Sequence, residues 1–183
     1  MKAGKVHRTL KRLAEALEAE SIPYAIVEGM ALNLLGYTRE TVAVDILLTP
    51  RGLEQFQERL VGRGYVPAFS GATKSFLDAQ TRVKVEALIT GEFPGDGKPK
   101  PVAFPAPESV SVERDGYCVI ALEKLIELKL ASGLTAPHRL RDLADVQDLI
   151  SLLGLPLELG EQLDDSVRNE YQRLWETVRQ ARE

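Results

Sequence analysis

The spacing of hydrophobic and polar positions changes several times along the chain, and each change marks a predicted element. Val6, Leu10, Leu13 and Leu17 recur at helical spacing, which predicts an amphipathic helix over residues 4–20. Short apolar runs bounded by turn residues predict strands. These runs cover residues 23–27, 42–48, 65–69, 74–77, 82–89, 110–112 and 117–120. The runs at 65–69 and 74–77 predict one hairpin, and those at 110–112 and 117–120 predict a second around Asp115 and Gly116.

Helical spacing returns between the strands and dominates after residue 120. Thr49 and Pro50 are suitable as the N-cap and first residue of a helix that follows the second strand. The predicted helices cover residues 28–35, 50–62, 121 onward, 138–153 and 158–182. The pattern therefore predicts an α/β fold, with a small mixed sheet flanked by helices and a helical C-terminal portion. We expect an α/β core over residues 1–120 and a helical portion over 121–183 that packs on it.

The run from Val42 to Leu48 contains a single charged residue, Asp45. An apolar run rich in β-branched residues is typical of a strand buried on both faces. Burying a lone carboxylate costs several kcal/mol unless a cation or hydrogen-bond donors meet it. We therefore expect Asp45 to have a partner, which is either an internal ion pair or donor group, or a bound metal ion.

Two other stretches carry candidate chemistry. The strand at 23–27 leads through Gly29 into a helix, and free backbone N–H groups at a helix N-terminus bind anions. The strand at 82–89 has one acid, Glu86, with Lys84 on the same face by the two-residue period of a strand.

These motifs resemble the nucleotidyltransferase superfamily, and in particular its minimal bacterial members found among abortive-infection toxins. The family pattern is Gly-Gly-x-Ala after the first strand, then Arg-x-Thr-x-Asp-x-Asp, then a third acid on a later strand. The matching residues are Gly29, Ala31, Arg39, Thr41, Asp45 and Glu86. Two positions depart from the pattern, because Glu28 replaces the first glycine and Ala43 replaces the first acid.

The resemblance implies a transfer of a nucleotidyl group from a nucleoside triphosphate to an unknown acceptor hydroxyl, with Mg²⁺ as cofactor. It assigns the metal to Asp45 and Glu86, and further catalytic roles to Lys129 and Asp142. It also implies contact with the nucleotide for a second set of residues. These are Gly29, Met30, Arg39, Thr41 and Lys84. A tRNA or a protein is the acceptor or partner that such toxins suggest.

Other interpretations of the same residues stay open. The missing acid at Ala43 favours a catalytically degenerate binding protein, and Lys84 then pairs with Glu86 and fills the space of a metal ion. Lys129 and Asp142 lie on or near the apolar faces of two predicted helices, so a structural ion pair is as good an explanation as a catalytic role. By the same helical spacing, Asp145 lies toward the edge of the apolar face.

Composition narrows the class of protein. The net charge of −4 and the pI near 5.4 argue against broad electrostatic binding of nucleic acid, although basic residues such as Lys5 and Arg12 occupy much of the first helix outside its apolar stripe. They form either a solvated face or a contact surface for RNA or an acidic partner. One cysteine, Cys118, excludes an internal disulfide. With neither a signal peptide nor a membrane-spanning run, we expect a cytoplasmic location.

Overall fold

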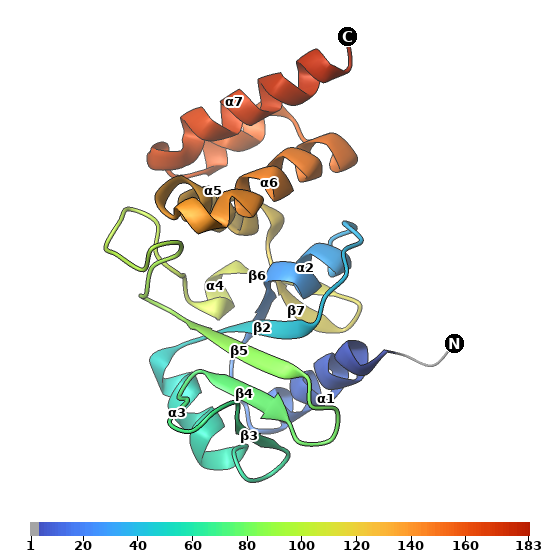
Figure 1. The fold of residues 1–183 in the computed structure, drawn as a ribbon, viewed down its shortest axis with the longest axis vertical. Helices are drawn as coiled ribbons and strands as arrows, with labels where there is room; N and C mark the ends of the chain where they lie inside the picture. The colour runs from blue at the N-terminus through green and yellow to red at the C-terminus, as the bar shows by residue number, and fades with distance from the viewer. Residues whose placement is uncertain (1–3) are drawn as a thin grey trace. The chain divides into compact units, whose positions relative to one another are not determined.

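The structure, a computed structural model, describes residues 4–183 and divides the chain into two compact units (Figure 1). One unit contains the chain up to Thr90 together with Pro105–Ile120. The other contains Gly91–Phe104 and Ala121–Glu183. Within residues 4–183, no helix is both long enough and apolar enough to cross a membrane.

The first unit is built on a seven-stranded mixed sheet with the strand order β3-β4-β5-β2-β1-β7-β6. Its strands are β1 (Ala25–Val27), β2 (Ala43–Leu48), β3 (Tyr65–Pro67), β4 (Ser75–Asp78), β5 (Lys84–Ile89), β6 (Ser111–Arg114) and β7 (Tyr117–Ile120). Its helices are α1 (Lys5–Ala19), α2 (Glu28–Leu34), α3 (Pro50–Arg59) and α4 (Pro107–Val110). β2 pairs in parallel with β5 and antiparallel with β1, so the predicted mixed sheet is confirmed.

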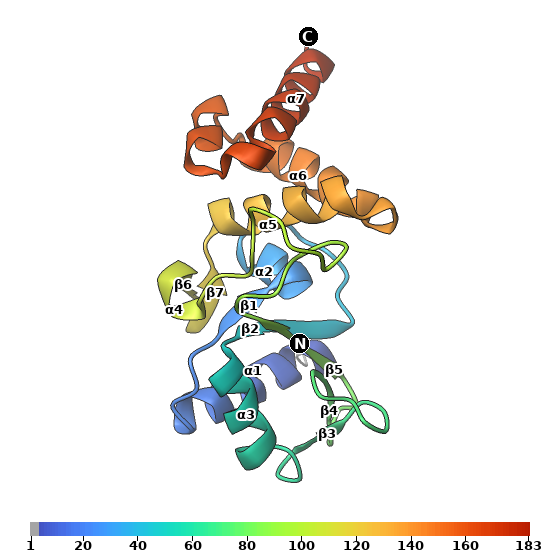
Figure 2. The ribbon, with the colours of Figure 1, turned by 90° about the vertical axis from the view of Figure 1, so that its left-hand side faces the viewer.

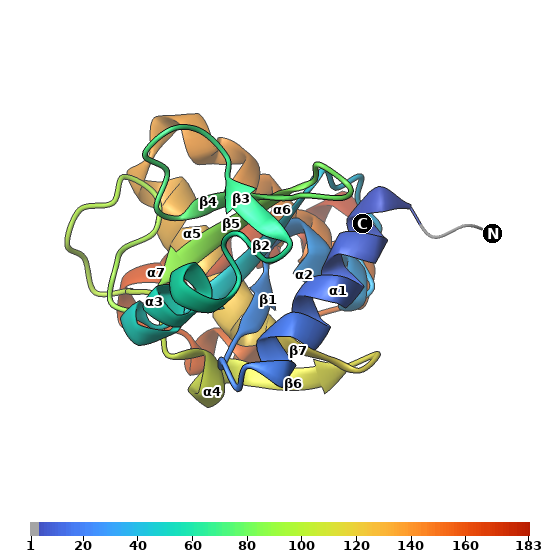
Figure 3. The ribbon, with the colours of Figure 1, turned by 90° about the horizontal axis from the view of Figure 1, so that it is seen from below.

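Helices cover both faces of this sheet. α1 and α3 lie on one face, and α2 lies on the other beside β1 and β2 (Figures 1 and 3). The predicted start of α3 is confirmed, because the Gly52 N–H donates to Thr49 Oγ1 at 2.9 Å and Pro50 is the first helical residue. A Cβ on Gly52 would lie 3.7 Å from Leu48 Cβ, so Leu48 belongs to the face that α3 covers.

The prediction that the run from Val42 to Leu48 is buried on both faces is wrong for its first half. β2 begins only at Ala43, and Val42 is 78% exposed. Along β2, Val44 is buried while Ala43 and Asp45 are half-buried, and only the residues from Ile46 onward are buried on both sides. Asp45 therefore lies on a partly open face, because alternate strand residues point to opposite faces and α2 covers this face only in part.

Both predicted hairpins are confirmed. β3 pairs antiparallel with β4, and β6 pairs antiparallel with β7. Asp115 and Gly116 connect β6 to β7 with φ angles of 52° and 86°. Positive φ at both central residues is the geometry of a type I′ turn, which matches the twist of antiparallel strands.

A buried acid, Asp78, connects α1 to the sheet. Arg12 Nη1 lies 2.7 Å from Asp78 Oδ1, and the Thr9 hydroxyl donates to Oδ2 at 3.0 Å. The Gln80 N–H also donates to Asp78 Oδ1. Arg12 thus belongs to an internal ion pair and not to a solvated face, which corrects the interpretation of α1 at this position.

The second unit is helical (Figure 2). It consists of α5 (Leu122–Thr135), η1 (Pro137–Arg139), α6 (Leu140–Leu153), η2 (Leu157–Gln162) and α7 (Asp165–Ala181). The prediction of one final helix from residue 158 is wrong, because Leu163 is extended and α7 starts anew at an N-cap, Asp164, whose side chain accepts from the Ser166 N–H.

The segment Gly91–Phe104 belongs to this unit and packs on α5. Gly95 has a φ of +73°, and a Cβ there would lie 2.9 Å from the Ser132 carbonyl oxygen. Within the segment, the Lys100 ammonium donates to the Pro94 carbonyl at 2.6 Å and pairs with Asp96 at 2.6 Å. These contacts connect Lys100 to the beginning of the proline-rich loop.

Candidate functional site

Asp45 and Glu86 lie directly opposite each other on the neighbouring parallel strands β2 and β5. Residues paired in register share a face of the sheet, so both carboxylates project from the same side. The same register places Ala43 opposite Lys84. The sequence-predicted metal residues are therefore brought together, with a lysine on the same face.

Each oxygen of the Glu86 carboxylate has a partner within the sheet. Lys84 Nζ lies 2.5 Å from Glu86 Oε1, and the Ser75 hydroxyl donates to Oε2 at 2.6 Å. The hydrogen bond and charge of Glu86, with a smaller contribution from Asp45, raise the pKa of the Lys84 ammonium above its usual range. The ammonium is therefore held in its charged form beside both acids.

The side chains on this face do not fit the magnesium ion that the fold family implies. Magnesium is held by carboxylates in near-octahedral geometry. Ala43 offers no ligand, and each Glu86 oxygen already has one partner, Lys84 or Ser75. Across residues 4–183, no group of three or more His, Cys, Asp or Glu side chains is placed to hold a metal ion.

The turn between β1 and α2 begins with Glu28, at the position where the family pattern has its first glycine, and the backbone there has a positive φ. Glu28 has a φ of 55°, the left-handed region that a side chain rarely adopts. The carboxylate lies in the first turn of α2, where it interacts favourably with the helix dipole. An acid therefore stands where the resemblance expects phosphate to approach. Met30, expected to contact a nucleotide, has its side chain buried in the core.

Gly29, Arg39 and Thr41 come together through α2. A Cβ on Gly29 would lie 3.0 Å from Thr41 Oγ1, so a larger residue would require the Thr41 side chain to shift. Asn33 donates to Thr41 Oγ1 at 3.1 Å and accepts from the Arg39 N–H at 2.7 Å. The Arg-x-Thr segment is thus fixed against α2 by packing and by an asparagine.

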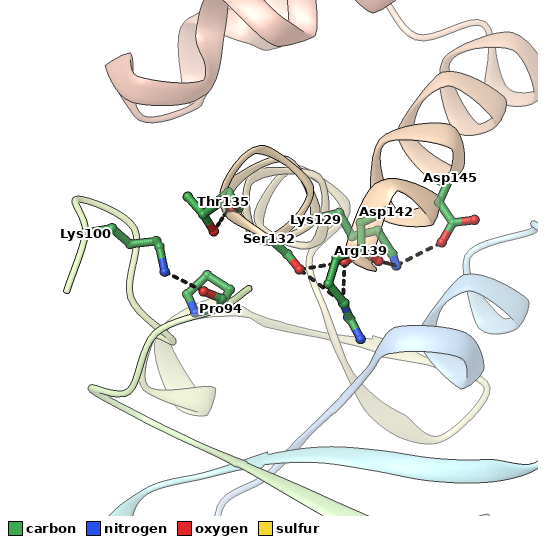
Figure 4. Close-up of polar contacts among 9 residues, drawn as sticks. Pro94, Lys100, Lys129, Ser132, Thr135, Arg139, Asp142 and Asp145 are labelled. Atoms are coloured by element: carbon green, nitrogen blue, oxygen red, sulfur yellow. Dashed lines mark hydrogen bonds and ion pairs between the residues drawn. The ribbon is translucent and has the colours of Figure 1, made fainter. Parts of the chain in front are cut away.

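The second unit contains a separate buried charge cluster on α5 and α6 (Figure 4). Lys129 is 2% exposed, and its ammonium donates to Asp142 Oδ1 and to Asp145 Oδ2, each at 3.1 Å. The Ser132 hydroxyl donates to Asp142 Oδ2 at 2.6 Å, and Arg139 Nε donates to the same oxygen at 3.0 Å. Asp145, which was expected toward the edge of the apolar face, is fully buried instead.

The charges in this cluster compensate one another. Burial raises the pKa of the Asp142 carboxyl, but the Lys129 ammonium, the Ser132 hydrogen bond and the Arg139 guanidinium together hold the pKa below its ordinary value. The predicted ion pair between Lys129 and Asp142 is present and connects α5 to α6. Nothing in the cluster is exposed except part of Arg139.

Three important side chains were not predicted from the sequence. Ser75 and Ser132 each hold a carboxylate, and Asn33 ties the Arg-x-Thr segment to α2. Ser75 pairs with Glu86 across β4 and β5, so a sequence signal for it requires the register of a hairpin. Ser132 lies three residues after Lys129, a helical spacing that places both on one side of α5.

Comparison with solved structures identifies the fold of this chain. No family model matches the sequence, and no curated protein matches it. The "putative nucleotidyltransferase" TM1012 from Thermotoga maritima is 19% identical with a TM-score of 0.50, over 84% of this chain and 96% of its own. A "putative nucleotidyltransferase" from Helicobacter pylori is 15% identical with a TM-score of 0.50, over 98% of this chain and 97% of its own.

JHP933 from Helicobacter pylori is similar at 14% identity with a TM-score of 0.51, over 96% of this chain and 91% of its own. These likenesses confirm the α/β fold that the sequence pattern predicted. The chain therefore has the fold of solved structures described as nucleotidyltransferases.

Proposed function

We propose that this protein binds a nucleoside triphosphate on the sheet face that carries Asp45 and Glu86, and does not transfer its nucleotidyl group. The observation that carries the proposal is the ion pair between Lys84 and Glu86 on this face, opposite Ala43. Stabilising the attacking and leaving oxygens of nucleotidyl transfer requires metal ions. A face with two acids, one of them paired with a lysine, lacks the ligands for that chemistry.

Positive groups for the nucleotide are nevertheless present. The Lys84 side chain is 49% exposed, and an ammonium has three donors, of which Glu86 takes one. Arg39 is half-buried on the segment that Asn33 of α2 holds, and it is a second candidate to contact phosphate. The hydrogen bond to Asn33 fixes the Arg39 backbone, which limits the positions that the guanidinium can reach.

Calorimetric titration with ATP, CTP, GTP and UTP tests this proposal. We expect one of the four to bind in the presence of EDTA, and we expect Lys84→Ala to weaken that binding. Asp45→Ala removes a negative charge from the same face and is the matched variant, for which we expect equal or tighter binding. Absence of binding by all four nucleotides would refute the proposal.

Transfer to a hydroxyl of tRNA or of a protein is the second candidate, which the register of Asp45 and Glu86 favours. An assay with α-labelled nucleotides and both acceptor classes decides between the two. We expect no label in either acceptor. Incorporation that is lost in both Asp45→Ala and Glu86→Ala would establish the transferase and overturn the binding-only proposal.

A further inference from the structure

Compared with the family pattern, this sheet face has Ala43 in place of one acid, and it carries a base, Lys84, at the neighbouring position. Ala43 and Lys84 are paired in register, and the next pair on the same face is Asp45 and Glu86. The alanine methyl at position 43 leaves room on β2 for the long lysine side chain of β5. The four residues therefore form a compact square of two acids, one base and one small residue.

The lysine provides what a divalent cation would provide to these acids. Its ammonium lies 2.5 Å from Glu86 Oε1, in direct ion-pair contact. Ser75 satisfies the second oxygen of Glu86 at 2.6 Å. Asp45 also interacts electrostatically with Lys84. A cation entering between the two acids would have to displace the ammonium.

We propose that the Lys84 ammonium is a built-in replacement for the divalent cation, and that it excludes magnesium from this face of the sheet. The ligand at this face is then recognised without metal. Only that last step rests on the proposed function, because exclusion of a metal ion by Lys84 does not require a nucleotide.

Direct titration with Mn²⁺, read by calorimetry and by electron paramagnetic resonance, tests the proposal. The variants are Lys84→Met, which keeps an apolar stem without the charge, and Lys84→Met combined with Ala43→Asp, which restores the third acid. Lys98→Met removes one charge from an exposed lysine in the other unit and is the matched control.

We expect no binding of millimolar Mn²⁺ by the native protein or by Lys98→Met. We expect measurable binding by Lys84→Met and binding at least about tenfold tighter by the double variant, since each added carboxylate strengthens a hard-cation site. Equal binding by the native protein and the double variant would overturn the proposal. Absence of binding by both Lys84 variants, each shown to be folded by circular dichroism, would also overturn it.

Thermal unfolding keeps the test decisive if the double variant does not fold. Mn²⁺ should then raise the Tm of Lys84→Met and leave the native Tm unchanged, because a ligand stabilises only the form that binds it. A rise in the native Tm equal to that of Lys84→Met would contradict the proposal. Failure of all four nucleotides to bind in EDTA would refute the proposed function and leave the result on Lys84 unaffected.

Discussion

At the scale of single residues, two lysines meet acids in opposite environments. Lys84 pairs with Glu86 where half of its side chain is exposed, and exposed ion pairs contribute about 0–1 kcal/mol to stability. Lys129 meets Asp142 and Asp145 where all three are buried. Removing one partner of a buried pair costs about 3–5 kcal/mol, since it leaves an uncompensated charge. We therefore propose that the helical cluster stabilises the second unit.

Substitution of Asp142 by asparagine tests this role through its pH dependence. The folded pKa of Asp142 is lower than its unfolded value, so its contribution to stability is fully present above about pH 4 and is lost as pH falls through the folded pKa. We expect Asp142→Asn to lower the free energy of unfolding by about 3–5 kcal/mol at neutral pH. That deficit should shrink on acidification in urea titrations.

The matched control is Asp165→Asn, because Asp165 is 89% exposed at the start of α7 and lies in the same unit. We expect it to cost less than about 1 kcal/mol. A deficit for Asp142→Asn that is as small as that of the control, or that does not change with pH, would rule out a stabilising charge cluster.

At the scale of elements, the local chemistry of the sequence predicts most boundaries and misses the non-local pairings. Thr49 and Pro50 predict the start of α3, and Asp115 with Gly116 predicts a hairpin, because these signals act within four residues. The Ser75 contact with Glu86 depends on the register between β4 and β5, which no local signal contains. The final helix was predicted too long, since Leu163 continues the apolar spacing across a break.

The close contact between α5 and α6 gives a prediction at this scale. A Cβ on Gly133 would lie 2.5 Å from Leu143 Cγ. Gly133→Ala should therefore lower the free energy of unfolding by about 1–3 kcal/mol, because overpacking outweighs the gain of about 1 kcal/mol in helix propensity. In a Leu143→Ala background the side-chain clash is removed and only the Leu143 backbone nitrogen, at 3.3 Å, stays close, so the same change should become neutral or stabilising.

Denaturant unfolding of the four proteins in this double-mutant cycle provides the measurement. The sign reversal distinguishes a steric contact from an effect on helix propensity, which would be the same in both backgrounds. An identical effect of Gly133→Ala with and without Leu143 would mean that the two helices do not depend on this contact.

At the scale of the whole molecule, the excess negative charge is confined to one unit. The first unit has thirteen acidic and thirteen basic residues, whereas the second has fourteen acidic and ten basic residues. The net charge of −4 thus belongs to the helical unit. The candidate basic surface is on α1 of the neutral unit, where Lys5 and Lys11 are exposed and Arg12 is engaged by Asp78.

This distribution predicts weak binding of tRNA, since affinity for nucleic acid depends on the number of phosphates that basic groups neutralise. We expect a Kd above about 10⁻⁴ M at physiological salt, the weak limit of non-specific binding. Mobility-shift titrations with tRNA over a series of salt concentrations measure it. The variant Lys5→Glu with Lys11→Glu tests α1 directly, and it should not change the weak binding of the native protein. Tight binding at physiological salt that this variant abolishes would show that α1 is an RNA-binding surface and not a solvated face.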